Sequence, residues 1–521
     1  MKKIFFACFL LCSVVAIAQK KGTTTTVTTT TKPKLVIGIV VDQMRWDYLY
    51  RFSNIFKSNG GFKRLMNEGF SCDNTFIPYT PTVTAAGHTC VYTGSVPGIH
   101  GITGNAWYDK DLGRSVYCSE DKTVQGVGGK DEVIGQMSPR NMLTTSITDE
   151  LRISSNFKSK VIGVALKDRG SILPAGHSAN AAYWYDGKSG NFITSTYYMN
   201  ALPTWVNNFN DRKLVDSFYK LNWNILLPKQ QYELLATDDK KEYEGTPFGK
   251  DQVGFPYDLN KFVGKDYSKI STTPYGNSLT TEMAKAAMVA EQLGKGNATD
   301  FIAISYSSPD YIGHSFGPNS WEIVDNYARL DMELGSLLDF LDKQVGKGQY
   351  TVFLTADHAV AHVAGFMKEN KLPGGTVDEE GGMKVVNKKL KELFGVDSLI
   401  LSTYNYQLTL NQLAIKNNNL DRKKITSWII EYYAKLDGIA RVFELEELMA
   451  TPLNSTIKDR IANGYFPKRS GDIQLVYLPG YMDGKYTGTT HGLWNPYDSH
   501  IPLLWYGWGV KKGNSHREVY M

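Results

Sequence analysis

Five runs of apolar residues recur along this 521-residue chain, and they constrain its fold more than any other feature. Within each run the apolar residues are continuous instead of alternating with polar ones, so both faces of the strand should be buried. Strands of this kind are typical of a parallel sheet covered by helices. The runs occupy residues 35–41, 161–166, 301–305, 350–355 and 501–506. We therefore predict an α/β fold whose central, mostly parallel sheet is flanked by helices on both faces.

Two segments between these runs have the apolar spacing of long helices. They cover residues 279–293 and 321–345, and a glycine follows each of them. In the second segment the apolar positions form one stripe, which we predict to be core: Ile323, Tyr327, Leu330, Leu334, Leu337 and Leu341.

Two other stretches differ in amino-acid composition and pattern from the predicted sheet and helices. Residues 178–277 are rich in aromatic residues, Asn, Asp and Gly, and residues 368–478 carry helical patterns of their own, such as residues 423–434. We interpret both as cap-like insertions in one catalytic domain over residues 34–521, where they could form lids or substrate walls.

The N-terminus has the pattern of a cleaved export signal. A basic MKK precedes the apolar IFFACFLLCSVVAIA, and the last residues fit the small-x-small cleavage rule. The apolar run is shorter than the roughly 20 residues of a membrane span. We predict a signal peptide over residues 1–18, a threonine-rich flexible spacer over residues 19–33, and a periplasmic or secreted protein that leaves the membrane after cleavage. A lipid anchor at Cys12 is an alternative, although Leu11 lies where a small residue is expected.

The cysteine content and the net charge bear on two further properties, disulfide bonding and nucleic-acid binding. Three cysteines stay in the mature chain, Cys72, Cys90 and Cys118, which permits one disulfide whose pairing the spacing does not decide. The net charge is only +5, with lysines interleaved among acidic residues. This pattern gives no indication of a nucleic-acid-binding surface.

Potential metal ligands follow the apolar runs where these end. The carboxyl ends of parallel strands meet at one edge of a sheet, so side chains at these positions should assemble into one site. A lone Asp after a strand is more often a helix cap, but the combination favours a site. Three Asp and three His would suffice for two zinc ions: Asp42, Asp310, His314, Asp357, His358 and His491.

A hydroxyl nucleophile is the second element of this hypothesis. The stretch PTVTAAGH places Thr84 at a strand-to-helix junction, where its hydroxyl and the first helical amides would meet a phosphate. Thr84 could instead be only a helix cap, and strand alternation does not separate it from Thr80 or Thr82. Two zinc ions can stabilise the attacking and leaving oxygens of an in-line displacement. These residues together predict a phosphate-ester hydrolase.

The third element of the hypothesis is a group of polar side chains that could bind a phosphoryl group. Lys167 and Arg169 in VIGVALKDRG would point to one side of an extended strand and could hold phosphoryl oxygens. The alternative is a solvated basic turn around Asp168. Asn105 in HGITGNAWYD could donate a further hydrogen bond or could only shape a turn.

Seven stretches carry a resemblance over nearly the whole mature chain: VVDQMRWDYL, PTVTAAGHT, YTGSVPGIHGITGN, ALKDRGSILPAGH, SSPDYIGHSFGP, LTADH and THG. They resemble the alkaline phosphatase superfamily, most closely the PafA-type secreted bacterial alkaline phosphatases. The resemblance implies an alkaline-phosphatase-like fold and favours Thr84 over Thr82 as a nucleophile that forms a covalent phosphothreonine. Many relatives have Gly after the Asp-His pair, where this chain has Ala359. We expect nearby His362 to have only a structural role.

The resemblance also assigns the ligands. It implies one zinc ion on Asp310, His314 and His491, and a second on Asp42, Asp357, His358 and the oxygen of Thr84. It further implies that Asn105, Lys167 and Arg169 contact the phosphoryl oxygens.

Members of this superfamily differ in activity, so the substrate class needs its own argument. PTVTAAGH lacks the C/S-x-P-x-R motif of sulfatases. Related phosphodiesterases generally lack the Lys-x-Arg pair, because a diester has one fewer anionic oxygen. We therefore expect a monomeric phosphatase of broad specificity for small-molecule phosphate monoesters. The alternatives are a phosphodiesterase or nucleotide pyrophosphatase of the same superfamily, and a non-catalytic zinc- or phosphate-binding protein.

Overall fold

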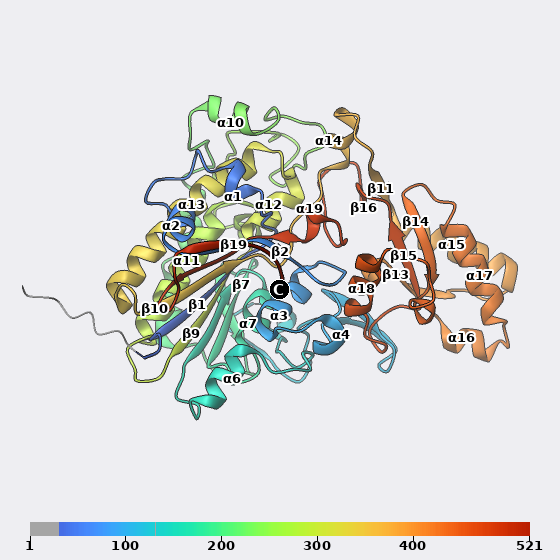
Figure 1. The fold of residues 1–521 in the computed structure, drawn as a ribbon, viewed down its shortest axis with the longest axis horizontal. Helices are drawn as coiled ribbons and strands as arrows, with labels where there is room; N and C mark the ends of the chain where they lie inside the picture. The colour runs from blue at the N-terminus through green and yellow to red at the C-terminus, as the bar shows by residue number, and fades with distance from the viewer. Residues whose placement is uncertain (1–30, 131) are drawn as a thin grey trace, which may run out of the picture. The chain divides into compact units, whose positions relative to one another are not determined.

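The computed structural model describes residues 31–130 and 132–521, and residues 32–521 form one compact unit (Figure 1). The predicted signal peptide, residues 1–18, and nearly all of the predicted spacer lie outside the described residues. Among the residues that are described, no helix has both the length and the apolar character that a membrane span requires.

Four strands predicted from the apolar runs lie side by side in the middle of the central sheet. β1 (Leu35–Val41) pairs in parallel with β9 (Asp300–Tyr306) and β10 (Tyr350–Thr355), and β6 (Val161–Ala165) pairs in parallel with β9. Every residue of β6 and β9 is buried. The prediction of a parallel sheet built from doubly buried strands is therefore confirmed for these four.

The fifth run behaves differently from the other four. It divides at Pro502 into β17 (His500–Ile501) and β18 (Leu503–Gly507), and β18 runs antiparallel to β10. Burial along β18 alternates, with Trp505 37% exposed. The sheet is therefore mixed at this side, because β18 packs on the core with one face only.

The sheet has eleven strands in the order β17-β2-β18-β10-β1-β9-β6-β7-β8-β5, with β19 paired to β2. β7 (Ala181–Asp186) is parallel to β6, and β8 (Asn191–Ser195) is antiparallel to β7. The sheet thus continues into the stretch predicted to be an insertion, because β7 and β8 lie within residues 178–277. The aromatic sequence of β7 concealed a strand whose six residues are all buried.

Helices cover both faces of the sheet (Figure 1). α11 (Tyr275–Ala290) and α13 (Trp321–Leu341) share the largest apolar cluster with Ile37 and Ile302. On the opposite face Tyr92 of α3 (Thr84–Thr93) packs against Val40 and Phe301. All six residues of the stripe predicted in α13 are buried in the core, as expected.

Residues 368–478 contain a second, smaller sheet with its own apolar cluster. Its strand order is β12-β13-β15-β14, and α15 and α17 pack beside it (Figure 1, orange). The bounds are β12 (Ile400–Ser402), β13 (Gln407–Leu410), β14 (Ile439–Glu444), β15 (Ile473–Tyr477), α15 (Glu379–Phe394) and α17 (Arg422–Tyr433). The helix predicted over residues 423–434 coincides with α17 to within one residue.

The remaining helices and strands connect these layers. They are α1 (Tyr48–Arg51), α2 (Gly61–Glu68), β2 (Phe70–Phe76), α4 (Pro97–His100), β3 (Ala106–Asp109), β4 (Arg114–Tyr117), β5 (Gly126–Val127), α5 (Glu132–Gly135), α6 (Ile147–Ser154), α7 (Asp168–Ala175), α8 (Thr204–Asp211), α9 (Leu214–Tyr219), α10 (Lys229–Leu235), α12 (Ser308–Phe316), α14 (Ala364–Glu369), β11 (Gly375–Val377), α16 (Gln412–Asn417), α18 (Ser455–Gly464), β16 (Tyr481–Asp483), α19 (Pro496–Ser499) and β19 (Gly513–Tyr520).

Cys72, Cys90 and Cys118 are all free thiols in the structure.

Candidate active site and metal-binding groups

The carboxyl ends of β1, β9 and β10 bring the predicted ligands together as two groups. Within each group, one ligand atom from every residue lies within 4.8 Å of the others. The first group is Asp310, His314 and His491, and the second is Asp42, Asp357 and His358. The six side chains predicted from sequence thus converge in the division that the resemblance implied.

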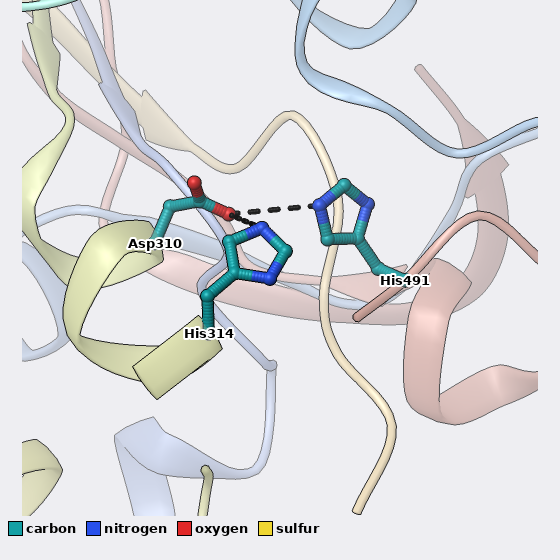
Figure 2. Close-up of side chains that lie close together, drawn as sticks. All are labelled: Asp310, His314 and His491. Carbon is teal, nitrogen blue, oxygen red and sulfur yellow. Dashed lines mark ion pairs between the residues drawn. The ribbon is translucent and has the colours of Figure 1, made fainter. Parts of the chain in front are cut away.

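The first group joins one turn of a helix to a distant loop (Figure 2). Asp310 and His314 are four residues apart in α12, so they share a face, and Nε2 of His314 lies 3.2 Å from Oδ1 of Asp310. Nε2 of His491 lies 3.6 Å from the same oxygen. One carboxylate oxygen and two imidazole nitrogens therefore face a common point.

The second group is fully buried and lies directly beside the first. Nε2 of His358 lies 3.5 Å from Oδ1 of Asp42 and 3.5 Å from Oδ2 of Asp357. The rings of His358 and His491 stack with centroids 3.4 Å apart. Oδ1 of Asp42 and Oδ2 of Asp357 are buried without a hydrogen-bond partner, as expected for oxygens that bind a cation.

Each ligand histidine is oriented by a backbone carbonyl. Because a carbonyl only accepts, Nδ1 carries the proton and Nε2 keeps its lone pair for the ligand group, which is the usual arrangement in metal sites. The Nδ1 bonds run from His314 to Thr489 O (2.7 Å), from His358 to Ala359 O (3.0 Å) and from His491 to Thr82 O (2.7 Å). The donor set and its orientation fit two divalent metal ions.

Three neighbouring threonines differ in what their hydroxyls contact. The hydroxyls of Thr80 and Thr82 donate to the carbonyls of Gly492 and Leu493. Thr84 is the first residue of α3, whose N-cap is Val83, and its Oγ1 lies 3.4 Å from Nε2 of His358. The geometry therefore favours Thr84 as the nucleophile and does not support the alternative that Thr84 is a helix cap.

Lys167 bridges the two groups. Its Nζ lies 2.5 Å from Oδ2 of Asp42, 2.6 Å from Oδ2 of Asp310 and 3.4 Å from Oγ1 of Thr84. Burial lowers the pKa of Lys167, but the carboxylates of Asp310 and Asp42 outweigh burial, so the pKa lies above its ordinary value. Lys167 is therefore a buried ammonium ion that contacts both groups and lies near the Thr84 hydroxyl.

Asn105 contacts the residue after Thr84, and Arg169 lines the same cavity as Lys167. The Oδ1 of Asn105 accepts from the amide of Ala85 at 2.9 Å, which leaves its amide nitrogen as the group that can donate. Nη1 of Arg169 donates to the hydroxyl of Tyr117 at 2.9 Å, and its Nε is buried without a partner. Both residues thus keep a donor for an anion.

Two cavities lie next to the ligand groups. One, of about 510 Å³, is lined by Lys167, Arg169 and the rings of Tyr117, Trp184 and Tyr311. The other, of about 480 Å³, is lined by residues that include His491, Tyr406 and Glu379. The space beside the candidate site suits small organic substituents.

Comparison with known proteins identifies the family. Residues 36–498 match the family described as type I phosphodiesterase / nucleotide pyrophosphatase. This chain belongs to that family, within the alkaline phosphatase superfamily. It is 50% identical over 499 residues to alkaline phosphatase PhoV of Synechococcus elongatus, an alignment that covers 94% of this chain and 88% of PhoV. It is 48% identical over 492 residues to alkaline phosphatase PafA of Elizabethkingia meningoseptica, with 94% and 90% covered.

A solved structure of this superfamily has the same fold. The crystal structure of wild-type alkaline phosphatase PafA superposes with a TM-score of 0.91 at 47% identity, covering 94% of each chain. The predicted alkaline-phosphatase-like fold is confirmed.

Three residues that the sequence interpretation missed contact the site in this family member. Nε2 of Gln43 donates to Oδ1 of Asp310 at 2.7 Å, and the Gln43 amide donates to Oδ1 of Asp357 at 3.2 Å, so Gln43 contacts both groups. Nε2 of His88 lies 2.8 Å from the hydroxyl of Ser305. Tyr117 is the third.

Gln43 and His88 could have been found from their positions in the sequence. Gln43 directly follows Asp42, and His88 lies one helical turn after Thr84, with its Nδ1 3.3 Å from Oδ2 of Asp357. Tyr117 lies on β4, far in sequence from Arg169, and carried no signal.

We expect Tyr117→Phe to lower kcat/KM for a phosphate monoester about tenfold, because the Arg169 guanidinium loses a hydrogen bond that orients it. Kinetics of the single and double variants with Arg169→Ala measure this. Tyr117→Phe should have no further effect when Arg169 is already alanine. Tyr108→Phe, on the paired strand β3, is the control and should be unchanged. Equal losses in both backgrounds would contradict a role through Arg169.

Proposed function

We propose that this protein is an alkaline phosphatase that hydrolyses small phosphate monoesters through a phosphothreonine on Thr84. One observation carries the proposal: the hydroxyl of Thr84 lies 3.4 Å from both the Lys167 ammonium and the His358 imidazole, where two buried metal-type groups meet. The relatives named alkaline phosphatases support the same activity.

The two groups are proposed to hold two zinc ions. One would bind Asp310, His314 and His491, and the other Asp42, Asp357, His358 and the Oγ1 of Thr84. When bound, the ions supply Lewis-acid stabilisation for the entering and leaving oxygens of an in-line displacement.

Side chains of this protein supply the nucleophile and bind the phosphoryl group. Oγ1 of Thr84 forms a bond to phosphorus as the ester oxygen departs, and water then attacks phosphorus and releases Thr84. Two in-line displacements retain the configuration at phosphorus. Lys167, Arg169 and the amide nitrogen of Asn105 bind the non-bridging oxygens, and the two cations balance negative charge on these oxygens throughout. Gln43 keeps the carboxylates of Asp310 and Asp357 in position, because its side-chain amide donates to Asp310 and its backbone amide donates to Asp357.

A second candidate function is phosphodiester hydrolysis, since the family description itself names phosphodiesterases. Lys167 and Arg169 favour monoesters, because two cations match a group with two negative charges better than a diester with one.

The deciding experiment compares a monoester and a diester that share one leaving group, such as 4-nitrophenyl phosphate and methyl 4-nitrophenyl phosphate. Wild type should prefer the monoester in kcat/KM. Arg169→Ala should lower the monoester value about 10² to 10³-fold and the diester value much less. Arg114→Ala is the matched control: Arg114 lies on β4 and its guanidinium pairs with Glu120, and its loss should change neither value. A wild-type preference for the diester would show that the proposed substrate class is wrong.

The proposal includes the site of action. The N-terminal pattern of a basic start, an apolar core and a small-x-small end supports export to the periplasm or the medium. A monomer is proposed as the active form.

A further inference from the structure

A turn of the smaller sheet contacts two loops of the candidate active site. The turn consists of Asn405 and Tyr406, which directly precede β13 within residues 368–478. One of the contacted loops carries His491 and the other carries Asn105. These two loops lie far apart in the sequence, so the turn joins distant parts of the site to the smaller sheet.

Tyr406 contacts the loop of His491 through its hydroxyl and its ring. The hydroxyl donates to the carbonyl of His491 at 3.0 Å. A Cβ at Gly492 would come within 2.6 Å of both the ring and the hydroxyl, so the ring packs directly on the backbone of the next residue. The imidazole of His491 is oriented separately, by the carbonyl of Thr82 at 2.7 Å. Tyr406 therefore fixes the backbone from which that imidazole projects.

Asn405 contacts the loop of Asn105 on both sides of that residue. Its Nδ2 donates to the carbonyl of Ala106 at 3.1 Å. On the other side, a Cβ at Gly104 would lie 2.3 Å from Oδ1 of Asn405, so only glycine leaves room for this side chain. The backbone before and after Asn105 therefore rests against Asn405.

Both residues of the turn have a left-handed backbone conformation. The φ angle is 63° at Asn405 and 61° at Tyr406. Asparagine adopts this conformation with some frequency, whereas it is unfavourable for a bulky residue such as tyrosine. Strained backbone of this kind persists only where the surrounding structure holds it, and it is common at functional sites.

Buried residues of the smaller sheet hold the turn in this conformation. Nε2 of Gln474 on β15 donates to the carbonyl of Tyr406 at 3.0 Å, and its Oε1 accepts from Nε2 of Gln407 on β13 at 3.1 Å. The ring of Tyr477 packs edge-on against Tyr406 with centroids 5.1 Å apart. The hydroxyl of Tyr477 in turn donates to Glu379 of α15 at 2.6 Å. The strain of the turn is thus maintained by contacts within residues 368–478.

We propose that Asn405 and Tyr406 are positioning residues of the active site. Tyr406 holds the backbone of His491 so that its imidazole faces Asp310, and Asn405 holds the loop from which Asn105 reaches the phosphoryl group. The roles of His491 and Asn105 rest on the proposed function. The smaller sheet therefore supports two loops of the site, because it keeps the turn in its left-handed conformation.

Tyr406→Phe tests the contact with His491, because it removes only the hydroxyl. The zinc-loaded full-length protein is titrated with a competing chelator, and the bound zinc is counted by elemental analysis. The ion on the group of His491 should bind roughly tenfold more weakly than in wild type, while the ion on the group of His358 is unchanged. In an Asp310→Asn background, which already lacks the first ion, Tyr406→Phe should have no effect.

Asn405→Gly tests the contact with the loop of Asn105. Glycine keeps the left-handed backbone and removes the side chain. Calorimetry with inorganic phosphate and zinc-loaded protein should show binding about three- to tenfold weaker than in wild type, with zinc affinity unchanged. In an Asn105→Ala background, Asn405→Gly should not weaken phosphate binding further.

Tyr433→Phe is the matched control. Tyr433 lies on α17 in the same apolar cluster as Tyr406, and its buried hydroxyl has no hydrogen-bond partner among the described residues. Neither zinc nor phosphate affinity should change in this variant.

Two results would overturn the positioning role. One is wild-type zinc affinity in Tyr406→Phe together with wild-type phosphate affinity in Asn405→Gly. The other is an equal weakening of both zinc ions with a lower Tm, because that is the effect of a general loss of stability. Neither readout requires turnover. If the variants behave as expected but wild type hydrolyses no monoester, the positioning role stands and the proposed function is wrong.

Discussion

Replacement of Thr84 by alanine should abolish turnover, with kcat for a phosphate monoester at least roughly 10⁴-fold lower. The reason is that no neighbour can replace it. The hydroxyls of Thr80 and Thr82 are buried and donate to the carbonyls of Gly492 and Leu493, whereas Oγ1 of Thr84 faces His358 and Lys167. Steady-state kinetics with 4-nitrophenyl phosphate measure the loss.

Controls separate a lost nucleophile from a damaged site. Thr84→Ala should still bind two zinc ions by elemental analysis and keep the wild-type Tm, because the six Asp and His ligands are unchanged. Thr84→Ser should recover most of the activity. Thr93→Ala, at the other end of α3, removes a hydroxyl that donates to Thr89 O and should leave kcat unchanged. Thr84→Ala with wild-type activity would refute the proposed mechanism.

Removal of the active-site metals should eliminate activity and also destabilise the protein. Asp42, Asp310 and Asp357 are buried together, and burial together with the carboxylates of Asp310 and Asp357 raises the pKa of Asp42. Without a bound metal, Lys167 is the ammonium in contact with two of them. We expect a strong chelator to lower Tm by about 5 to 10 °C, and activity and Tm to return with added zinc.

Metal counts make this prediction specific. Wild type should contain two zinc ions per chain. Asp310→Asn should lose the ion of its own group, since the carboxylate oxygen at the centre of that group becomes an amide. His362→Ala is the control, because His362 bonds Asn319 and belongs to neither group, so its two ions should remain. A fully active enzyme without bound metal would exclude the two-metal hypothesis.

Much of the fold was predictable because its signals are local. β1, β6, β9 and β10 follow from continuous apolar runs, and the stripe of α13 follows from helical spacing; both patterns lie within one element. The direction of β18 and the membership of β7 in the sheet were not predictable. Pairing direction depends on which strand a segment meets in space, and the aromatic composition of β7 resembled a loop-rich insertion.

For the candidate site, the sequence determined which side chains stand at strand ends, since that depends only on where each strand stops. It predicted the six candidate ligands together with Lys167, Arg169 and Asn105. Among these, Asp42, Lys167 and Asp357 lie within two residues of the ends of β1, β6 and β10, whereas His491 and Asn105 lie in loops. Only the tertiary structure decided which threonine hydroxyl faces the two groups, which nitrogen of each histidine faces its group, and that Gln43 and Lys167 each contact both groups. Those properties arise from hydrogen bonds between residues that are mostly more than 80 positions apart, and no local pattern encodes such contacts.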